Sequence, residues 1–406
     1  MNKLFAWIIA IVAPLLVAAC GGGSPPGMPA NVTVVPHDSS ATVTWTMDSG
    51  IEYWVWSGAG TVTQQTCTTF LNCVINRGVS SPFLVTGLTN GTSYSVFVNG
   101  AHDGSPVGQS SPSLGFVPIP AGSTWTLGPP LGQGNLLGIG YTPLTTTTAT
   151  TFVTVGSGGT IFSSPDSSTW TARTSNVAVN LNAVAFALAT FAVVGDSGVI
   201  LTSTDGVTWT ARTSGTSNNL HGLTTNGSLM LAVGGGGTIL VSSDGTTWTQ
   251  QTSNTTRDLY GVTFGTNLFV AVGAGGTLLT SAGGANWTPV ASGTTSDLKS
   301  VAFGNGVYVA VGASGALVTS ADGVTWTARP PISANNFNAV VFGSQFVAVG
   351  NGGAIYVSAD GVTWQAAKSG TTNDLYALVY SASVAANTLA VGYTAVGAAG
   401  VNLTSY

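Results

Sequence analysis

The sequence predicts an all-β protein whose larger part is a β-propeller, and three regularities support that prediction. Tryptophans recur at Trp125, Trp170, Trp209, Trp248, Trp287, Trp326 and Trp364, with spacings of 45, 39, 39, 39, 39 and 38 residues. Short β-branched or aromatic runs lie between them, each bounded by Gly, Asn, Asp or Ser. No long window combines helical periodicity with helix caps. A period of about 40 residues made of short strands is typical of four-stranded propeller blades.

Residues 258–296 illustrate the strands expected in one blade. Apolar runs at 259–264, 268–272, 277–281 and 286–290 are separated by short turn segments. A single four-stranded sheet cannot bury both of its faces. We therefore expect each sheet to pack against a neighbour on either side, in a ring that leaves no exposed end.

The repeat count predicts seven blades over residues 123–406. Seven glycines precede the third strand of each repeat, at Gly159, Gly198, Gly237, Gly276, Gly315, Gly353 and Gly400. The repeat region begins with only the Trp strand, at 123–127, and ends with only the other three strands, finishing at 401–406. The last blade is therefore expected to combine strands from both ends and to close the ring. The longer first spacing is assigned to a lengthened hairpin loop at 143–148.

A recurring Ser-x-Asp-Gly-x-Thr-Trp segment is expected to form a tight turn that needs no ligand. Its copies lie around Asp166, Asp205, Asp244, Asp322 and Asp360, and Gly283 replaces the aspartate in a sixth copy. The carboxylate accepts local backbone N–H bonds, Gly takes a positive φ, and the Trp is buried between sheets. The segment resembles the Asp-box of sialidase-type (BNR) propellers, which usually has one more residue between Asp and Gly. The whole repeat resembles the seven-bladed Ycf48/HCF136-type photosystem II assembly factors. Both resemblances imply the fold and say little of function.

Residues 1–19 are expected to be a signal peptide. A positive residue and an apolar run, from Lys3 to Ala19, lead into the sequence Leu-Val-Ala-Ala-Cys at 16–20. This resembles a bacterial lipobox, which implies cleavage before Cys20 and a lipid anchor on it. The Gly after the cysteine implies an outer-membrane position in the bacterial cell envelope, and 20–27 is a Gly/Pro-rich tether. An ordinary secretory signal with an incidental cysteine is the alternative.

Residues 28–118 form a first domain with the alternating pattern of half-buried strands. The segment from Leu88 to Tyr94 resembles the corner of fibronectin type III domains, where the Tyr hydroxyl returns to the backbone. Trp45 stands where that family keeps a core Trp. The resemblance implies a fibronectin type III-like β-sandwich that acts as a spacer or binding module.

Two pairs of side chains in this domain leave alternatives open. Cys67 and Cys73, in an exported chain, are compatible with a local disulfide, and two free thiols are the alternative. Trp54 and Trp56 share one strand face. We expect core packing there, with an aromatic ligand platform as the alternative.

Two columns of residues lead into the first strand of each blade. The uniform column is Asn135, Asn180, Asn219, Asp258, Asp297, Asn336 and Asp374. Its uniformity predicts an Asx turn that serves the fold. The varied column, two residues later, is Leu137, Asn182, His221, Tyr260, Lys299, Asn338 and Tyr376. The varied column is freer to serve recognition.

The predicted binding surface is the channel mouth, where the varied column and the loops between second and third strands share one face. The candidate ligand-binding residues are Asp196, His221, Arg257, Tyr260, Lys299 and Tyr376. A polar rim without a ligand is the alternative.

Charge and chemistry narrow the functional classes. Only 5% of residues are charged, the net charge is −5, and no basic stripe is present, which argues against nucleic-acid binding. No metal-ligand cluster or phosphate loop stands out, so we expect no metal and no cofactor. The glutamate that activates the sialidase nucleophile has no candidate in the propeller: Glu52 is the sole glutamate and lies outside it. Arg173, Arg212 and Arg329 fall on the outermost strands, away from the mouth.

The sequence therefore favours a lipid-anchored, non-catalytic module that binds a protein or a glycan through the propeller face. One alternative is a glycoside hydrolase that uses two mouth aspartates. A second is an assembly factor of the Ycf48 type, although the expected basic patch is not visible.

Overall fold

The computed structural model describes residues 25–64, 66–69, 73–101, 108–143, 150–385 and 388–406. These residues form β-strands and short 3-10 turns, so the predicted all-β class is confirmed. The expected signal peptide, Cys20 and most of the predicted hairpin insertion lie outside the described residues. Within the described part, no helix has the length and apolarity needed to cross a membrane.

Seven strands before residue 117 form a β-sandwich. They are β1 (Thr33–His37), β2 (Ser40–Thr44), β3 (Glu52–Ala59), β4 (Val74–Asn76), β5 (Phe83–Thr86), β6 (Tyr94–Ala101) and β7 (Leu114–Phe116), with the 3-10 turn η1 (Thr66–Thr69). One sheet has the order β1-β2-β5 and the other β4-β3-β6-β7. Val43 and Val85 of the first sheet pack against Val55 and Val98 of the second, with Trp45 in the same core. Alternation along the strands therefore builds one shared apolar layer.

Three local features of the sandwich were expected from the sequence. The Tyr94 hydroxyl accepts the backbone N–H of Thr89 at 3.0 Å. Cys67 and Cys73 form a disulfide, with Cα atoms 5.6 Å apart. Trp54 and Trp56 are only 3% and 7% exposed, so they belong to a packed cluster and offer no ligand platform.

The remaining strands form the propeller. They are β8 (Thr126–Leu127), β9 (Leu136–Tyr141), β10 (Phe152–Gly156), β11 (Ile161–Ser164), β12 (Thr171–Arg173), β13 (Leu181–Ala187), β14 (Thr190–Gly195), β15 (Ile200–Ser203), β16 (Thr210–Arg212), β17 (Leu220–Thr225), β18 (Met230–Gly234), β19 (Ile239–Ser242), β20 (Thr249–Gln251), β21 (Leu259–Gly265), β22 (Leu268–Gly273), β23 (Leu278–Ser281), β24 (Thr288–Pro289), β25 (Leu298–Gly304), β26 (Val307–Gly312), β27 (Leu317–Ser320), β28 (Thr327–Arg329), β29 (Phe337–Phe342), β30 (Phe346–Gly350), β31 (Ile355–Ser358), β32 (Gln365–Ala367), β33 (Leu375–Ala385), β34 (Thr388–Gly397) and β35 (Asn402–Ser405).

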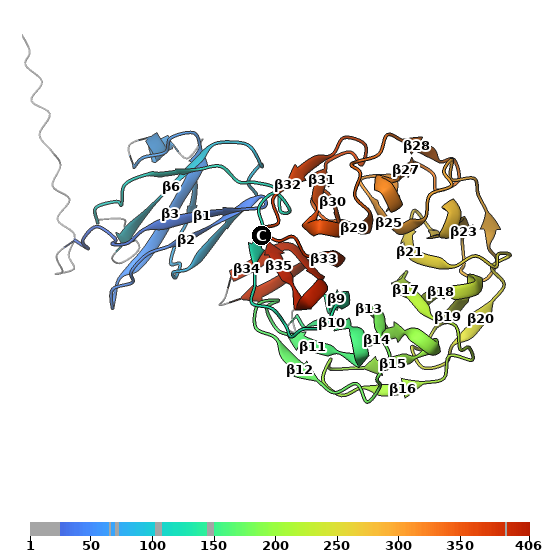
Figure 1. The fold of residues 1–406 in the computed structure, drawn as a ribbon. Helices are drawn as coiled ribbons and strands as arrows, with labels where there is room; N and C mark the ends of the chain where they lie inside the picture. Colours follow the sequence, from blue (N-terminus) through green and yellow to red (C-terminus); the bar gives the residue numbers. More distant parts are fainter. Residues whose placement is uncertain (1–24, 65, 70–72, 102–107, 144–149, 386–387) are drawn as a thin grey trace, which may run out of the picture.

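These strands make seven four-stranded antiparallel sheets in the described residues, arranged around a central axis (Figure 1). We number them blades 1 to 7, beginning with β9–β12 and continuing by fours to β29–β32. Blade 7 has the order β33-β34-β35-β8. The first strand of each blade lies innermost, and β33 of blade 7 contacts β9 of blade 1.

Apolar side chains from neighbouring blades share each interface. Between blades 3 and 4, Leu231 and Val233 pack with Phe269, Leu279 and Trp287. Trp287 is 3% exposed, as expected for the repeat tryptophans. Full burial of one such aliphatic or aromatic side chain stabilises the fold by roughly 1.5–3 kcal/mol. The blades therefore depend on each other for most of their core.

A 3-10 turn joins the second and third strands of every blade. The turns are η2 (Ser157–Gly159), η3 (Asp196–Gly198), η4 (Gly235–Gly237), η5 (Ala274–Gly276), η6 (Ala313–Gly315), η7 (Asn351–Gly353) and η8 (Ala398–Gly400). The repeated glycine comes last in each turn. At Gly276, φ is +71° and an added Cβ would lie 2.0 Å from the Thr294 carbonyl oxygen, so a side chain does not fit. The glycine column thus reflects both conformation and space.

Blade 7 takes its outermost strand from the start of the repeat region. Thr126 pairs with Thr404, and Leu127 with Leu403. Without β35, the strand β8 has no partner and the hydrogen-bonding edge of β34 is open.

Deletion of residues 397–406 is therefore expected to abolish the propeller's thermal transition while the sandwich stays folded. Calorimetry of the truncated chain measures this directly. A propeller transition at the unmodified temperature would show that blade 7 does not depend on the β8–β35 pairing.

Candidate functional site

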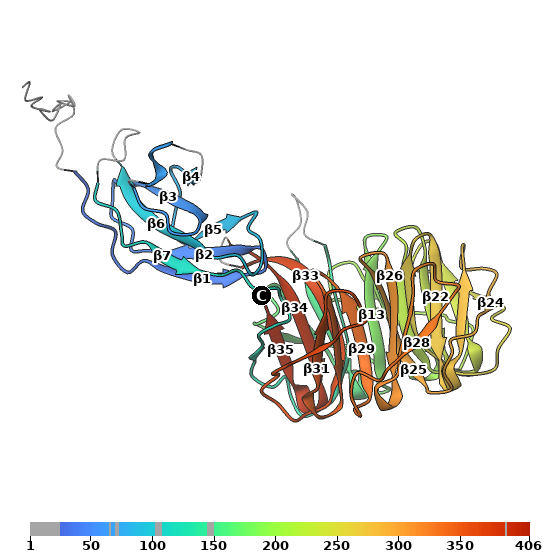
Figure 2. The same ribbon diagram turned by 90° about the horizontal axis from the view of Figure 1, so that it is seen from above.

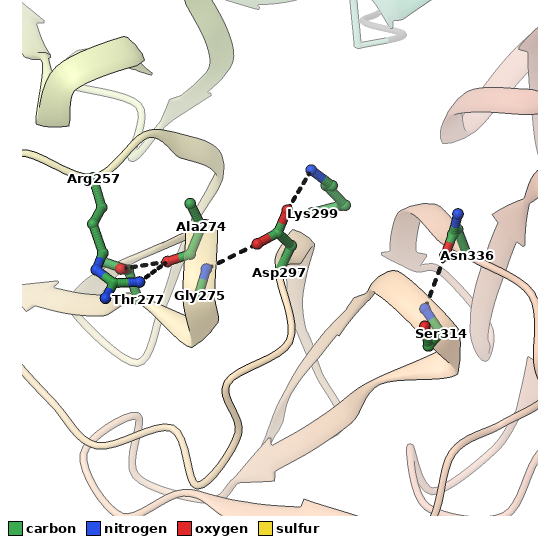
Figure 3. A network of polar contacts seen from close by, with 8 residues as sticks. All are labelled: Arg257, Ala274, Gly275, Thr277, Asp297, Lys299, Ser314 and Asn336. Atoms are coloured by element: carbon green, nitrogen blue, oxygen red, sulfur yellow. Dashed lines mark hydrogen bonds and ion pairs between the residues drawn. The ribbon is translucent and has the colours of Figure 1, made fainter.

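The uniform column of Asn and Asp residues connects neighbouring blades. Each side chain accepts the backbone N–H at the middle of the preceding blade's 3-10 turn. The pairs are Gly158–Asn180, Ser197–Asn219, Gly236–Asp258, Gly275–Asp297, Ser314–Asn336, Gly352–Asp374 and Ala399–Asn135, at 2.7–3.3 Å. The last pair joins blade 7 to blade 1. We call these residues the inter-blade hooks; Figure 3 shows two of them, Asp297 and Asn336.

The backbone of each hook bonds within its own blade. The Asp297 carbonyl, for example, accepts the N–H of Ala313 at 2.9 Å, while its carboxylate accepts the N–H of Gly275 from the blade before. The prediction of a local Asx turn was therefore wrong in the identity of the donor. The reason is that neighbouring innermost strands are packed side by side, which brings the preceding blade's turn within hydrogen-bond distance of the side chain.

The varied column stands at a β-bulge in each innermost strand. The register with the second strand shifts between Leu259 and Gly261, which leaves Tyr260 without a direct partner. Equivalent shifts surround His221, Lys299 and Tyr376. A bulge re-aims its side chain away from the ladder. Each blade therefore presents one side chain at its bulge. The sheet can pack in the same way whichever residue stands there.

Three of the six predicted site residues come together as a row across blades 3 to 5. The His221 and Tyr260 rings lie 5.7 Å apart, and the Lys299 ammonium lies 3.6 Å from the centre of the Tyr260 ring. Lys299 also forms an ion pair with Asp297 at 3.2 Å, and Figure 3 shows both side chains beside the Gly275 turn. All three row residues are half-buried. We call this set the mouth row.

The electrostatics of the row follow from its neighbours. Burial lowers the pKa of His221, as does Lys299, while the carboxylates of Asp258 and Asp196 raise it. The backbone N–H of Gly275 and then the Lys299 ammonium lower the pKa of Asp297. The row therefore combines an imidazole whose pKa is lowered, a tyrosine ring, and a lysine that forms an ion pair with Asp297.

Asp196 has a structural role that sequence reasoning missed. Its two carboxylate oxygens accept the side-chain amides of Asn182 and Asn180, at 2.9 and 3.0 Å. Asn182 also donates to the Leu220 carbonyl of the next blade. Asn338 makes the same pair of contacts in blade 6, to Asn351 and Leu375. Asn at the bulge position was the available signal for these bridges.

Arg257 does not join the row. Its guanidinium donates to the Ala274 carbonyl at 3.5 Å and lies directly over Gly275, whose missing side chain leaves room for it (Figure 3). Arg257 also borders two open grooves, of about 770 and 900 Å³, on the outer part of blades 3 and 4. Arg257 therefore lies beside the 3-10 turn of blade 4, outside the row, and its positive charge still acts on the Asp297 carboxylate.

Tyr376 stands apart from the row, on blade 7. Burial and then the Asp374 carboxylate raise its pKa. Blade 6, whose bulge residue is Asn338, lies between Lys299 on blade 5 and Tyr376 on blade 7. The mouth is thus a continuous row over blades 3 to 5 with a separate tyrosine on blade 7.

The Asp-box turns lie at the opposite end of each blade, between the third and fourth strands. Asp205 accepts the N–H groups of Val207 and Thr208 at 2.8 and 2.9 Å, and these bonds lower its pKa. The same bonds from Thr363 and Val362 lower the pKa of Asp360 to about 2. The carboxylates therefore hold the turns and do not face the mouth, as the sequence predicted.

The outer-strand arginines are bound to hydroxyl groups of their own blades. Arg173, Arg212 and Arg329 donate to Ser163, Thr202 and Thr319, at 2.8–2.9 Å. They do not assemble the Arg cluster that sialidases need. Among the described residues, no group of three His, Cys, Asp or Glu side chains has an arrangement that could hold a metal ion.

Comparisons with known proteins support the propeller. Residues 292–402 match the family described as the DUF6242 beta propeller domain. No curated protein matches the chain.

Solved propellers are similar in structure. YCF48 from Cyanidioschyzon merolae is 20% identical with a TM-score of 0.55, over 70% of this chain and 98% of that one. A structure described as YCF48 bound to D1 peptide is 18% identical with a TM-score of 0.56, over 69% and 94%. The WD40 propeller of Doa1 is 13% identical with a TM-score of 0.53, over 70% and 97%. At these identities the similarity shows the fold alone, a β-propeller with Ycf48-like structural neighbours.

The mouth row predicts how the pKa of His221 responds to substitution. Lys299→Met should raise it, because a nearby positive charge is removed, and Asp258→Asn should lower it. Asn occupies the hook position in four other blades, so the second change keeps the hook. NMR titration of the His221 ring protons measures both shifts, with Lys368→Met as the control on an exposed site. No change in either variant would contradict the contact between His221 and these charges.

Proposed function

We propose that this protein is a non-catalytic binding module that captures a partner protein at the channel mouth. The observation that carries the proposal is the mouth row, in which bulges present His221, Tyr260 and Lys299 side by side on three consecutive blades. Aromatic rings combined with a cationic side chain are typical of binding hot spots. The residue type varies along the row, whereas every hook is Asn or Asp.

The state of the mouth carboxylates disfavours glycoside hydrolysis. That reaction needs a pair of carboxyl groups, one to protonate the leaving group and one to act as nucleophile or base. Asp258, Asp297 and Asp374 each use one oxygen to bind the preceding blade, and Asp196 uses both oxygens for amides. A binding role requires no such free pair.

A protein partner is favoured over a glycan by the neighbour described as bound to a D1 peptide. That structure concerns another protein, and it supports a peptide as the kind of ligand such a propeller accommodates. A role in assembling a membrane complex, as in Ycf48-type factors, is a narrower form of the same proposal.

We further propose that residues 28–118 are a fibronectin type III-like spacer. The three- and four-stranded sheets and the bond from Thr89 to the Tyr94 hydroxyl support this. In this proposal, a lipid on Cys20 and the Gly/Pro-rich tether at 20–27 hold the spacer at the outer membrane of the cell envelope.

Selection from a displayed peptide library, in parallel with a glycan array, tests the partner class. For a selected peptide, Tyr260→Ala, Lys299→Ala or Tyr376→Ala should weaken binding by roughly tenfold or more, since hot-spot truncations cost about 1–2 kcal/mol or more. Folding stability should change by less than about 0.5 kcal/mol, because these side chains line a surface.

Lys368→Ala is the matched control, because Lys368 is exposed and lies outside the mouth. Unchanged affinity in all three mouth variants would place the binding surface elsewhere. Selection of glycans and no peptide would replace the protein partner with a carbohydrate.

Replacement Cys20→Ser is expected to abolish lipid attachment and to release the protein from the membrane fraction. Detergent-phase partitioning and mass spectrometry of the mature N-terminus measure these effects, with Cys67→Ser as a control for loss of a cysteine alone. A Cys20→Ser protein that stays in the detergent phase would disprove the anchor.

A further inference from the structure

The segment between the sandwich and the propeller is part of the propeller's core. Ala121 is 1% exposed and packs in the same cluster as Val347 and Tyr393 of blades 6 and 7. Gly122 has a φ of +91°, and an added Cβ would lie 2.8 Å from a methyl group of Val347. A free linker would instead be exposed and unconstrained.

Hydrogen bonds fix this segment at several points. The Gln345 side-chain amide donates to the Ala121 carbonyl at 2.8 Å. The Gly122 N–H donates to the Ser405 hydroxyl at 2.7 Å. On the sandwich side, the Gly91 N–H donates to the Pro118 carbonyl at 2.9 Å. The segment is therefore bonded to both domains within a few residues.

The end of the sandwich also contacts blade 7 directly. Asp38, in the turn between β1 and β2, is held by the Asn90 side-chain amide at 2.7 Å. Burial, followed by the Asp38 carboxylate, raises the pKa of Tyr380 in β33 to about 12, so the two groups act on each other across the domain boundary. Strand β5 contacts β34 in the same region.

The first two strands of blade 7 are longer than those of the other blades. Strands β33 and β34 have 11 and 10 residues, whereas β21 and β22 of blade 4 have 7 and 6. The extra length lies at the turn between first and second strands, which is the end of the blade opposite the hooks and the mouth row. Figure 2 shows the sandwich beside β33 and β34 at the rim of the propeller.

We infer that the sandwich and the propeller form one rigid unit, locked by residues 118–122 and by the contacts of Asp38 and β5 with β33 and β34. The lock holds the sandwich at the end of blade 7 opposite the mouth row. The mouth is consequently turned away from the sandwich, and its direction is set by the fold and not by a hinge. This inference does not depend on the identity of the partner.

Distance measurement by pulsed electron spin resonance tests the lock in the full chain. Val35→Cys on β1 and Val207→Cys on blade 2 provide exposed labelling sites, in a Cys20→Ser background where Cys67 and Cys73 remain paired. We expect a single narrow distance distribution for the unmodified lock. Gln345→Ala combined with Asp38→Ala should abolish that narrow peak.

Gln250→Ala is the matched control, since Gln250 is exposed on β20, far from the sandwich. If Gln345→Ala lowers the stability of the propeller, Asp38→Ala is measured alone. Asp38 is only partly buried, so this change leaves the propeller core intact. A broad distribution in the chain with the intact lock would overturn the inference. If the narrow peak persists in every variant, these contacts do not hold the two domains together, and the inference is wrong about the lock.

Discussion

The propeller depends on one repeated interaction, the double attachment made by each inter-blade hook. The carbonyl of a hook such as Asp297 binds the 3-10 turn of its own blade, and its side chain binds the turn of the blade before. A net contribution of about 0.5–1.5 kcal/mol for each neutral bond is modest. Its importance is positional, because it sets the distance between neighbouring innermost strands at the mouth. Apolar packing alone does not fix that distance, since apolar attraction has no direction.

The hooks also explain how the mouth can vary. Because the hook position carries the structural bonds, the bulge two residues later carries none that every blade requires. Blades 2 and 6 use it for bridging Asn side chains, and blades 3 to 5 use it for the mouth row. Only 5% of the residues are charged, yet the hook and bulge columns together contain Lys299 and three carboxylates. The bulge column therefore consists of side chains that the fold can exchange at little cost.

Much of the fold could be read from the sequence because every blade repeats the same local chemistry. The strands of residues 258–296, the glycine ending each 3-10 turn and the Asp-box bonds all follow from turn preferences and strand patterns. The partners of long polar side chains could not be read in this way. Periodicity identified Asp297 as structural but not the blade that supplies its donor. The two Asn amides that bind Asp196, and the space over Gly275 that Arg257 occupies, are examples. Such choices depend on distances between blades, which no single repeat contains.

The shared blade has a consequence for the order of folding. The bond between the Gly122 N–H and the Ser405 hydroxyl joins residues 283 positions apart, whereas contacts within a blade are local. Loop-closure entropy makes such distant pairings late events, and slow ones in β-rich chains. The first six blades can fold before the C-terminal residues are in place. Strand β8 can pair only after β35 has formed. A chain that lacks β35 keeps unpaired strand edges, and an open edge is a template for pairing with another chain. Blade 7, and with it the ring, is thus complete only once β35 is available to pair with β8.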